Sequence, residues 1–259
     1  MNRIDELFSR KKEGVLNIYF TAGYPHLEDT TRIILALDKS GVDIIEIGMP
    51  YSDPMADGPT IQESGSQALR NGMTLDVLFE QLKDIRKQSQ VPLLFMGYLN
   101  QMMQYGVDHF LEACKLAGID GLIIPDLPVD IYETELKDKV EAAGLHIIFL
   151  ITPQTSESRV RKIDALAKGF VYMVSNASIT GAKSEITQSQ LDYFERIKAM
   201  NLKNPRLIGF GISTHETFMQ ACTYAEGAIV GSAFIKQLGN AENGLEHTIS
   251  NFVHQLKEG

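Results

Sequence analysis

Three carboxylates lie close together in the sequence where an apolar run gives way to turn residues. The stretch DIIEIGMPYSDPMADGPTIQES, residues 43–64, holds Glu46 inside the apolar run and Asp53 and Asp57 after it. A buried Glu without a partner is costly unless its pKa rises, and a Glu with a raised pKa can act as acid and base in turn. The residue types therefore favour Glu46 as an acid–base group.

Other interpretations of the three carboxylates stay open. Glu46 could pair with a Lys or Arg on a neighbouring strand, but no predicted strand carries either residue inside its run, and Arg206 only begins one. Asp57 stands in an Asp-Gly-Pro turn before a helix predicted to begin near Pro59, so a structural and a functional role fit it equally well. Asp53 is a turn-type residue before proline and fits a structural role better on local grounds.

Two glycine-containing segments near the C-terminal end could hold an anion. LIGFGIST contains a Gly-x-Gly turn ending at Gly211, and GAIVGSAFIKQLG places Gly231 and Ser232 before a short helical piece at 233–238. Glycines let backbone N–H groups approach a phosphate, and a helix N-terminus adds partial positive charge. Plain turns are the alternative.

The segment 175–188 is long and rich in small residues, and could be a mobile lid or a simple connection.

The chain that must position these residues alternates between strand-like and helix-like segments. The strand-like runs are apolar almost throughout, as strands covered on both faces should be. They cover residues 16–23, 42–48, 91–97, 120–126, 146–152, 169–175, 206–211 and 227–232. Strands alternating with helices imply parallel pairing. We therefore predict a single (β/α)8 barrel domain over residues 1–259 rather than an open doubly wound sheet.

Two further elements are predicted around this barrel. Ile4, Leu7 and Phe8 fall at helical spacing near the N-terminus, so an amphipathic helix should precede the first strand. The piece 233–238 should form an extra short helix after the last strand. Active sites of such barrels lie at the C-terminal ends of the strands, which places Glu46 near the active face.

Composition and residue placement exclude several classes of function. Lys plus Arg number 24 and Asp plus Glu 33, a net charge of −9 that argues against a dedicated nucleic-acid or anionic-membrane surface. The N-terminus is too charged for a signal peptide, and the apolar runs are far shorter than the ~20 residues that span a bilayer. We expect a cytoplasmic protein with two buried, reduced cysteines. Scattered His residues and the lack of a strand Lys favour acid–base chemistry without a metal or Schiff base.

Motifs along the whole chain resemble the tryptophan synthase alpha subunit family. The most specific is IEIGMPYSDPMADGPTIQ, joined by YFTAGYP, YGVDHFLEACKLAGIDGLIIPDLPVD, GFVYMVS, GFGIS and GAIVGSAFIK. The resemblance implies a TIM barrel that cleaves indole-3-glycerol phosphate to indole and glyceraldehyde 3-phosphate. It implies no cofactor in this chain. It also implies an α2β2 complex, in which indole passes to a beta subunit that uses pyridoxal phosphate.

The resemblance further implies roles for single residues. The catalytic Glu and Asp fall on Glu46 and Asp57, the active-site Tyr on Tyr172, and a loop Thr that contacts the catalytic Asp on Thr180. The other implied positions are phosphate ligands at Gly181, Gly211, Gly231 and Ser232, indole-pocket residues at Phe20, Ile123, Ile151 and Phe210, and subunit-contact residues at Asp53, Pro54 and Asn100.

One segment departs from the family pattern. In SNASITG, Asn176 stands where the family usually has Arg and Ser178 where it usually has Gly. We expect the chemistry to survive, whereas loop closure and its coupling to the partner could differ.

Two alternative functions of the chain stay open. They are a mainly regulatory subunit that binds glycerol phosphates, and another phosphate-binding barrel enzyme such as a sugar-phosphate isomerase.

Overall fold

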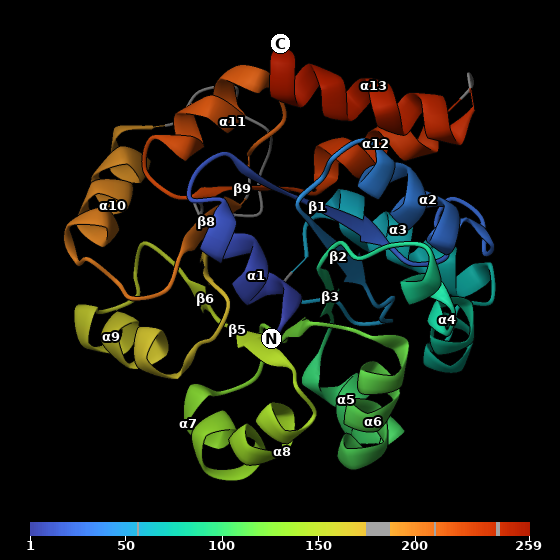
Figure 1. Cartoon of the computed structure of the whole chain (residues 1–259), viewed down its shortest axis with the longest axis horizontal. Coiled ribbons are helices and arrows are strands. Elements are labelled where there is room, and N and C mark those ends of the chain that lie inside the picture. The colour runs from blue at the N-terminus through green and yellow to red at the C-terminus, as the bar shows by residue number, and fades with distance from the viewer. Residues whose placement is uncertain (56, 175–186, 210, 242–243) are drawn as a thin grey trace.

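Parallel strands form a ring at the centre of the molecule (Figure 1). The computed structural model describes residues 1–55, 57–174, 187–209, 211–241 and 244–259. Nine strands pair in the order β5-β4-β3-β2-β1-β9-β8-β7-β6. Their bounds are β1 Val15–Thr21, β2 Ile44–Gly48, β3 Leu93–Met96, β4 Gly121–Ile123, β5 His146–Ile148, β6 Leu150–Ile151, β7 Val171–Val174, β8 Arg206–Gly209 and β9 Gly227–Val230. Each predicted strand-like run overlaps at least one of them, and β1 begins one residue before its run.

The fifth predicted strand closes the ring, although it is divided in two. β5 pairs with β4 through Ile148, and β6 pairs with β7 from Leu150. Only Phe149 separates the two pieces, and its carbonyl accepts a hydrogen bond from the Tyr172 N–H at 3.0 Å. The two ends of the strand order are therefore consecutive in the chain. The predicted (β/α)8 barrel is confirmed, with its fifth strand position shared by β5 and β6.

Helices surround the ring on the outside (Figure 1). They are α2 Asp29–Lys39, α3 Pro59–Arg70, α4 Leu75–Leu82, α5 Leu99–Tyr105, α6 Val107–Ala117, α7 Val129–Ile131, α8 Lys137–Ala142, α9 Glu157–Leu166, α10 Gln188–Ala199, α11 His215–Cys222, α12 Ser232–Gly239 and α13 Leu245–Glu258. A π-helical stretch, Tyr132–Leu136, joins α7 to α8. α12 is the predicted extra helix after the last strand. In the described part of the chain, no helix is long and apolar enough to cross a membrane.

Side chains on the strands alternate between an inner and an outer apolar cluster. The inner cluster fills the barrel and contains Ile4, Leu7, Phe8, Val15, Ile44, Leu94, Ile123, Ile148, Phe170, Tyr172, Val174, Leu207 and Ile229. The next residue along a strand faces the helices, so Leu16 and Ile45 belong to the outer cluster. Because side-chain direction alternates along a strand, only every second residue points into the barrel and can reach its mouth.

The N-terminal helix α1, Arg3–Arg10, closes the N-terminal end of the barrel. Figure 1 shows it lying across the centre of the ring. Its buried residues Ile4, Leu7 and Phe8 join the inner cluster, as the helical spacing predicted. Because these side chains fill this end, the barrel is a packed core and not a pore.

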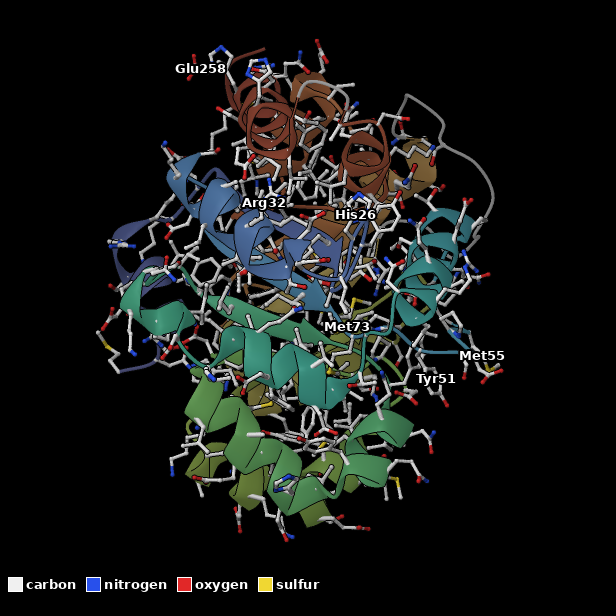
Figure 2. The ribbon with its side chains drawn as sticks, turned by 90° about the vertical axis from the view of Figure 1, so that its right-hand side faces the viewer. His26, Arg32, Tyr51, Met55, Met73 and Glu258 are labelled. Carbon is white, nitrogen blue, oxygen red and sulfur yellow. The ribbon has the colours of Figure 1, made fainter. Side chains whose placement is uncertain are left out.

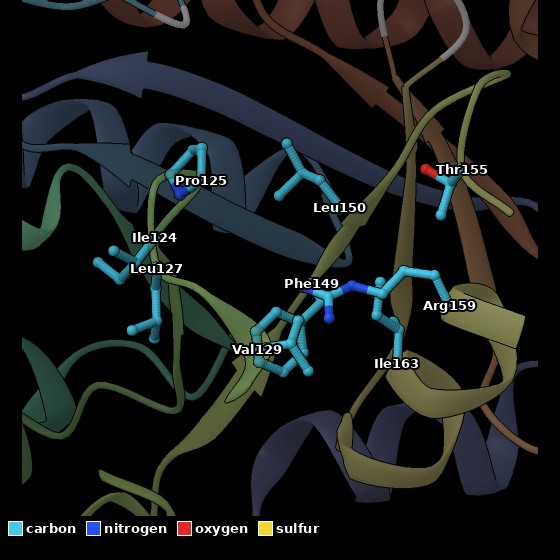
Figure 3. A pocket seen from close by; sticks show the side chains of 9 residues that line it. All are labelled: Ile124, Pro125, Leu127, Val129, Phe149, Leu150, Thr155, Arg159 and Ile163. Atoms are coloured by element: carbon cyan, nitrogen blue, oxygen red, sulfur yellow. The ribbon is translucent and has the colours of Figure 1, made fainter. Parts of the chain in front are cut away.

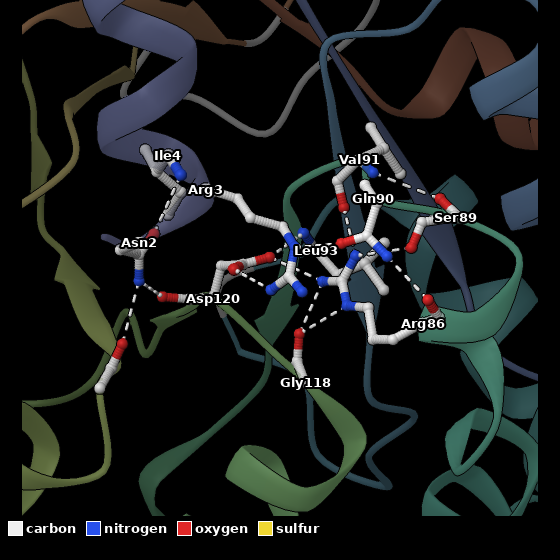
Figure 4. A network of polar contacts seen from close by, with 11 residues as sticks. Asn2, Arg3, Ile4, Arg86, Ser89, Gln90, Val91, Leu93, Gly118 and Asp120 are labelled. Carbon is white, nitrogen blue, oxygen red and sulfur yellow. Dashed lines mark hydrogen bonds and ion pairs between the residues drawn. The ribbon is translucent and has the colours of Figure 1, made fainter.

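A polar network fixes this helix to the barrel (Figure 4). The Asp120 carboxylate accepts from Arg3 Nη1 at 3.0 Å, from Arg86 Nη2 at 2.7 Å and from the Leu93 N–H at 2.9 Å. The Asn2 side chain adds a hydrogen bond to the Asp120 carbonyl at 2.8 Å. The Asp120 side chain is only 3% exposed, so it needs these donors. This end of the barrel serves stability and leaves the opposite end for chemistry.

Candidate active site

Glu46 lies in the middle of β2 and is 1% exposed. Asn17 Nδ2, on the neighbouring strand β1, donates a hydrogen bond to Glu46 Oε2 at 3.0 Å. Oε1 has no hydrogen-bond partner among the described residues. Burial raises the pKa of Glu46 to about 8, although the Asn17 hydrogen bond acts against the rise and the charge of Asp57 adds to it. No cation from the described part of the chain contributes to this balance, so the structure does not support an ion pair with Lys or Arg.

Asp57 lies in the segment between β2 and α3, close enough to Glu46 for their charges to interact. The Tyr98 hydroxyl donates to Asp57 Oδ2 at 3.1 Å. Burial raises the pKa of Asp57 to about 6, and the Tyr98 hydrogen bond limits the rise. The backbone is held on both sides, because the Asp57 N–H donates to the Pro54 carbonyl and the Gln62 amide donates to the Asp57 carbonyl. Within the described ranges, no cluster of three His, Cys, Asp or Glu could hold a metal.

Two buried tyrosines complete the surroundings of the carboxylates. Burial, together with the charges of Glu46 and Asp57, raises the pKa of Tyr19 and of Tyr172 well above the usual range. Glycines make room for both rings. A Cβ at Gly48 would lie 2.1 Å from the Tyr19 hydroxyl, and one at Gly209 would lie 2.4 Å from that of Tyr172. The structure thus places Tyr172 beside the two carboxylates.

Tyr19 lies at the site although no sequence pattern indicated it. It pairs in register with Glu46 across β1 and β2 and therefore lies in the same layer of the barrel. The resemblance pointed instead to Phe20, which is the next residue along the strand and pairs in register with Ile47, so its side chain points to the opposite face from those of Tyr19 and Glu46. The structure does not bring Phe20 to the mouth. Counting alternate residues along β1 would have selected Tyr19.

The same shift of one residue affects another predicted indole-pocket position. Ile151 belongs to the outer cluster, whereas its neighbour Leu150 packs against the inner cluster. Leu150 also pairs in register with Tyr172. Ile123, in contrast, does face the barrel interior. Three further predicted positions, Thr180, Gly181 and Phe210, lie outside the described residues, as do Asn176 and Ser178.

The predicted phosphate loops lie after β8 and β9. Gly211 has a φ of +82°, which favours glycine, and no atom of the described residues lies within 4 Å of where a Cβ would stand. Gly231 directly precedes α12, and Ser232 is its first residue. The first N–H groups of a helix have no partner within the helix and attract anions. The backbone at these loops therefore suits a phosphate group.

The three predicted subunit-contact residues lie beside Asp57. Asn100 is exposed, and its side-chain amide donates to the Tyr51 hydroxyl at 2.9 Å. The Tyr51 ring stacks on Tyr98 at 5.2 Å between centroids, and Tyr98 in turn donates to Asp57. Asp53 is exposed as well, and Pro54 is half-buried. A chain of contacts thus joins this surface to one carboxylate.

The same surface is apolar and hollowed. Tyr51 and Met55 project together from one side of the molecule (Figure 2), and Met55 is 87% exposed. A groove of about 400 Å³ lies next to them. It is lined by Pro50, Tyr51, Leu69, Met73, Thr74, Leu75, Asp76, Leu78, Asn100, Gln101, Gln104 and Tyr105.

A second, smaller hollow lies between the end of β4, β6 and α9 (Figure 3). Its volume is about 150 Å³, and Leu150, Phe149 and Arg159 are among its lining residues. Neither hollow is lined by Glu46. Glu46 itself is 1% exposed.

Comparison with known proteins agrees with this geometry. The family described as tryptophan synthase alpha chain matches residues 6–258. The tryptophan synthase alpha chain of Flavobacterium psychrophilum is 58% identical over 256 residues, which cover 99% of this chain and 100% of the relative. The chain belongs to the tryptophan synthase alpha chain family. As a member of this family it is a lyase of tryptophan biosynthesis, and the resemblance found in its motifs is confirmed.

Solved structures of tryptophan synthase have the same fold. The subunit alpha from Legionella pneumophila is 34% identical, with a TM-score of 0.88, and the match covers 100% of this chain and 98% of that chain. A chain of the tryptophan synthase complex from Pyrococcus furiosus is 36% identical, with a TM-score of 0.86, and the match covers 95% and 98%. The barrel and its N-terminal helix are thus compared over nearly their whole length.

Proposed function

We propose that this chain cleaves indole-3-glycerol phosphate to indole and glyceraldehyde 3-phosphate, with Glu46 as the acid–base residue and Asp57 as the partner of the indole nitrogen. The observation that carries the proposal is the pair of carboxylates at the mouth of a closed barrel. One of them is fully enclosed, with a pKa raised to about 8, and the other has a pKa of about 6. At neutral pH the first holds a proton and the second is mostly ionised.

These two protonation states match the two halves of a retro-aldol cleavage. Protonated Glu46 gives its proton to C3 of the indole ring, which becomes an iminium cation. The Glu46 carboxylate then takes the proton of the glycerol hydroxyl next to C3. The bond between C3 and the glycerol carbon breaks, its electron pair restores the aromatic indole, and an aldehyde forms. Glu46 ends the cycle protonated, as it began.

Ionised Asp57 acts on the charge that develops at the ring nitrogen. It accepts the N–H of the indole ring, which becomes positively charged only as C3 is protonated. The stabilisation is therefore larger in the transition state than in the ground state, so it raises the rate as well as the affinity. Tyr98 holds Asp57 in place through its hydroxyl.

The variant Glu46→Gln tests the acid–base role. Gln fills the same space and can still accept from Asn17, so the fold should be kept. Indole release should fall by roughly 10²–10⁴-fold, the usual contribution of a positioned acid–base group. Single-turnover indole release measures it. Near-normal release by a folded Glu46→Gln chain would refute the role, and a wild-type chain that binds glycerol phosphate without releasing indole would favour the regulatory alternative.

We also propose a tryptophan synthase beta subunit as partner, in an α2β2 complex whose pyridoxal phosphate is held by the beta chain. The exposed, apolar surface around Asp53, Pro54 and Asn100 supports this proposal, as does the match to a chain of a tryptophan synthase complex. Its contacts run through Tyr51 and Tyr98 to Asp57, so docking here can bias the conformation of the catalytic carboxylate.

Substitution at this surface tests the partner. Adding the cognate beta subunit should raise indole release, and Asn100→Ala should weaken both binding and activation. Asn251→Ala is the matched control, because Asn251 is an exposed amide on α13. Equal loss of binding in both variants, or activation that Asn100→Ala leaves intact, would place the interface elsewhere.

A further inference from the structure

Asn17 is a buried amide inside the barrel that the proposed mechanism does not use. It is 0% exposed and lies on β1, in register with Ile44 of β2 and Ile229 of β9. Both of these neighbours belong to the inner apolar cluster. An amide in such a layer costs free energy unless its polar atoms are paired. Asn17 therefore needs a reason to be there.

The only side chain that Asn17 bonds among the described residues is Glu46. Its Nδ2 donates to Glu46 Oε2 at 3.0 Å, and both residues are fully enclosed. Asn17 Oδ1 and Glu46 Oε1 are left without partners among the described residues. In register, Asn17 lies one layer below Glu46, on the side away from the mouth. The contact thus fixes Oε2 toward the interior and leaves Oε1 as the oxygen available to react.

An amide suits a residue that must be acid and base in turn. The N–H of Asn17 donates to the carboxylate form of Glu46, which can only accept. In the protonated form the proton lies on Oε1, and Oε2, which is then the carbonyl oxygen, still accepts the Asn17 N–H. An apolar residue at position 17 would pair with neither form, and a carboxylate would oppose the ionised one.

We propose that Asn17 is a positioning residue that orients the Glu46 carboxyl in both of its protonation states and selects Oε1 as the reacting oxygen. The proposal rests on the proposed role of Glu46 as the acid–base residue. It adds that Asn17 on β1, on the side of Glu46 away from the barrel mouth, controls the ionisation of Glu46 together with its other neighbours.

The other groups that face Glu46 act in the opposite direction or are neutral. Asp57 approaches from the segment after β2, Tyr19 from β1 and Tyr172 from β7. Tyr98 lies behind Asp57. Asp57 disfavours a charge on Glu46, whereas Asn17 is the neighbour whose hydrogen bond favours it. Removing Asn17 therefore moves the ionisation of Glu46 to higher pH.

Two variants separate the contact from mere packing. Asn17→Leu has a similar size and removes both donor and acceptor. Asn17→Asp keeps an acceptor and replaces the amide N–H with a carboxyl group. Ser89→Ala is the control, since Ser89 is also a buried polar residue but lies at the opposite end of the barrel, where its Oγ accepts from the Val91 N–H. All three change a buried polar group, and only the first two remove the amide that contacts Glu46.

The first measurement does not depend on activity. Infrared difference spectra across pH report the carboxyl band of Glu46, which Glu46→Gln identifies by its loss. In both Asn17 variants the midpoint of this band should rise by about 1–2 pH units relative to wild type, the size expected for one lost hydrogen bond to a charged group. It should not move in Ser89→Ala. An unchanged midpoint in folded Asn17→Leu and Asn17→Asp overturns the proposal.

The second measurement is the pH dependence of indole release. In the Asn17 variants kcat should fall about tenfold with KM nearly unchanged, and the limb that belongs to Glu46 should move with the infrared midpoint. A rise in KM with kcat unchanged would overturn the positioning role. If Glu46→Gln remains active, the proposed function fails, while the infrared midpoint still decides whether Asn17 controls Glu46.

Discussion

At the level of single residues, burial divides two similar carboxyl groups into an acid and an anion. Glu46 is enclosed by the barrel and has one hydrogen bond, from Asn17, that favours its charged form. Asp57 lies nearer the mouth and receives the hydroxyl of Tyr98. Burial raises the pKa of the first to about 8 and of the second to about 6. Their environments, rather than their chemistry, assign their roles.

Removing the Tyr98 hydroxyl should move the ionisation of Asp57 further upward. The hydrogen bond favours the carboxylate, so Tyr98→Phe raises the pKa of Asp57 above about 6. The acid limb of kcat/KM for indole release should therefore move up by about one pH unit, and activity should fall at about pH 6–7 more than at about pH 8. A pH profile of the variant measures this shift.

Tyr105→Phe is the matched control for this experiment. The Tyr105 hydroxyl also donates to an aspartate, Asp76 Oδ1, at 2.9 Å, but on the exposed surface. Its loss should leave the profile in place. An acid limb that stays put in Tyr98→Phe, or that moves equally in Tyr105→Phe, would show that the hydroxyl of Tyr98 does not set the charge of Asp57.

The sequence predicted some of these residues and not others, for a physical reason. Glu46 was conspicuous because a carboxylate interrupts an apolar run, and Asp57 followed from a specific motif. Asn17 and Tyr19 did not stand out in the sequence, because a lone amide or phenol in a strand is compatible with a core position. Phe20 and Ile151 were placed one residue away from Tyr19 and Leu150. Matching motifs did not take into account that side chains alternate along a strand, so that neighbouring residues point to opposite faces.

At the level of elements, short strands deliver loop backbone to the barrel mouth. β8 ends at Gly209 and β9 at Val230, and each is followed by glycine before the next helix begins. The helices were predicted well because apolar periodicity and caps are local signals. Gly41, for example, follows α2 with a φ of +78°, the conformation in which glycine commonly ends a helix. The break at Phe149 depends on which neighbour each half pairs with, which no local signal contains.

We expect the loop after β8 to bind phosphate through its backbone. Gly211→Ala adds a Cβ that projects into open space, where the anion is proposed to lie, at a φ of +82°. Binding of glycerol 3-phosphate should fall by about tenfold or more, because the backbone N–H groups can no longer approach the anion. Calorimetric titration measures the affinity.

Gly14→Ala separates anion binding from backbone strain. Gly14 also has a positive φ, +65°, and nothing in the described part of the chain lies within 4 Å of where its Cβ would stand, but it precedes β1 at the other end of the barrel. Both variants should lose stability by about 1–2 kcal/mol, the usual penalty for a left-handed residue other than glycine. Only Gly211→Ala should lose affinity. Equal affinities in the two variants would place the phosphate elsewhere.

At the level of the whole molecule, the two ends of the barrel have opposite tasks. At the N-terminal end, Asp120 is paired with two arginines and α1 fills the interior. At the C-terminal end, Glu46 is buried and Asp57 is half-buried, and no cation from the described residues contributes to the pKa of either. Such uncompensated groups are expected at a catalytic site and lower the stability of the fold.

This arrangement predicts that the chain loses stability as pH rises from about 4 to about 8. The folded-state pKa values, about 8 for Glu46 and about 6 for Asp57, lie above the ordinary values of 4.5 and 3.8. In this window the unfolded chain has released protons that the folded chain still holds. The free energy of unfolding therefore falls with pH and levels off once the folded carboxyls ionise. For Glu46 the loss is up to roughly 5 kcal/mol.

Urea unfolding of Glu46→Gln/Asp57→Asn at several pH values checks this sign. The double variant lacks both of these carboxyls, so its stability relative to wild type should increase from about pH 5 and level off above about pH 8. Asp130→Asn is the control. Lys162 lowers the pKa of the exposed Asp130, so removing that carboxylate cannot relieve stability lost on the alkaline side. If the gain of the double variant were the same at both ends of this range, Glu46 and Asp57 would not be held in uncompensated burial, and the division of their roles would lose its physical basis.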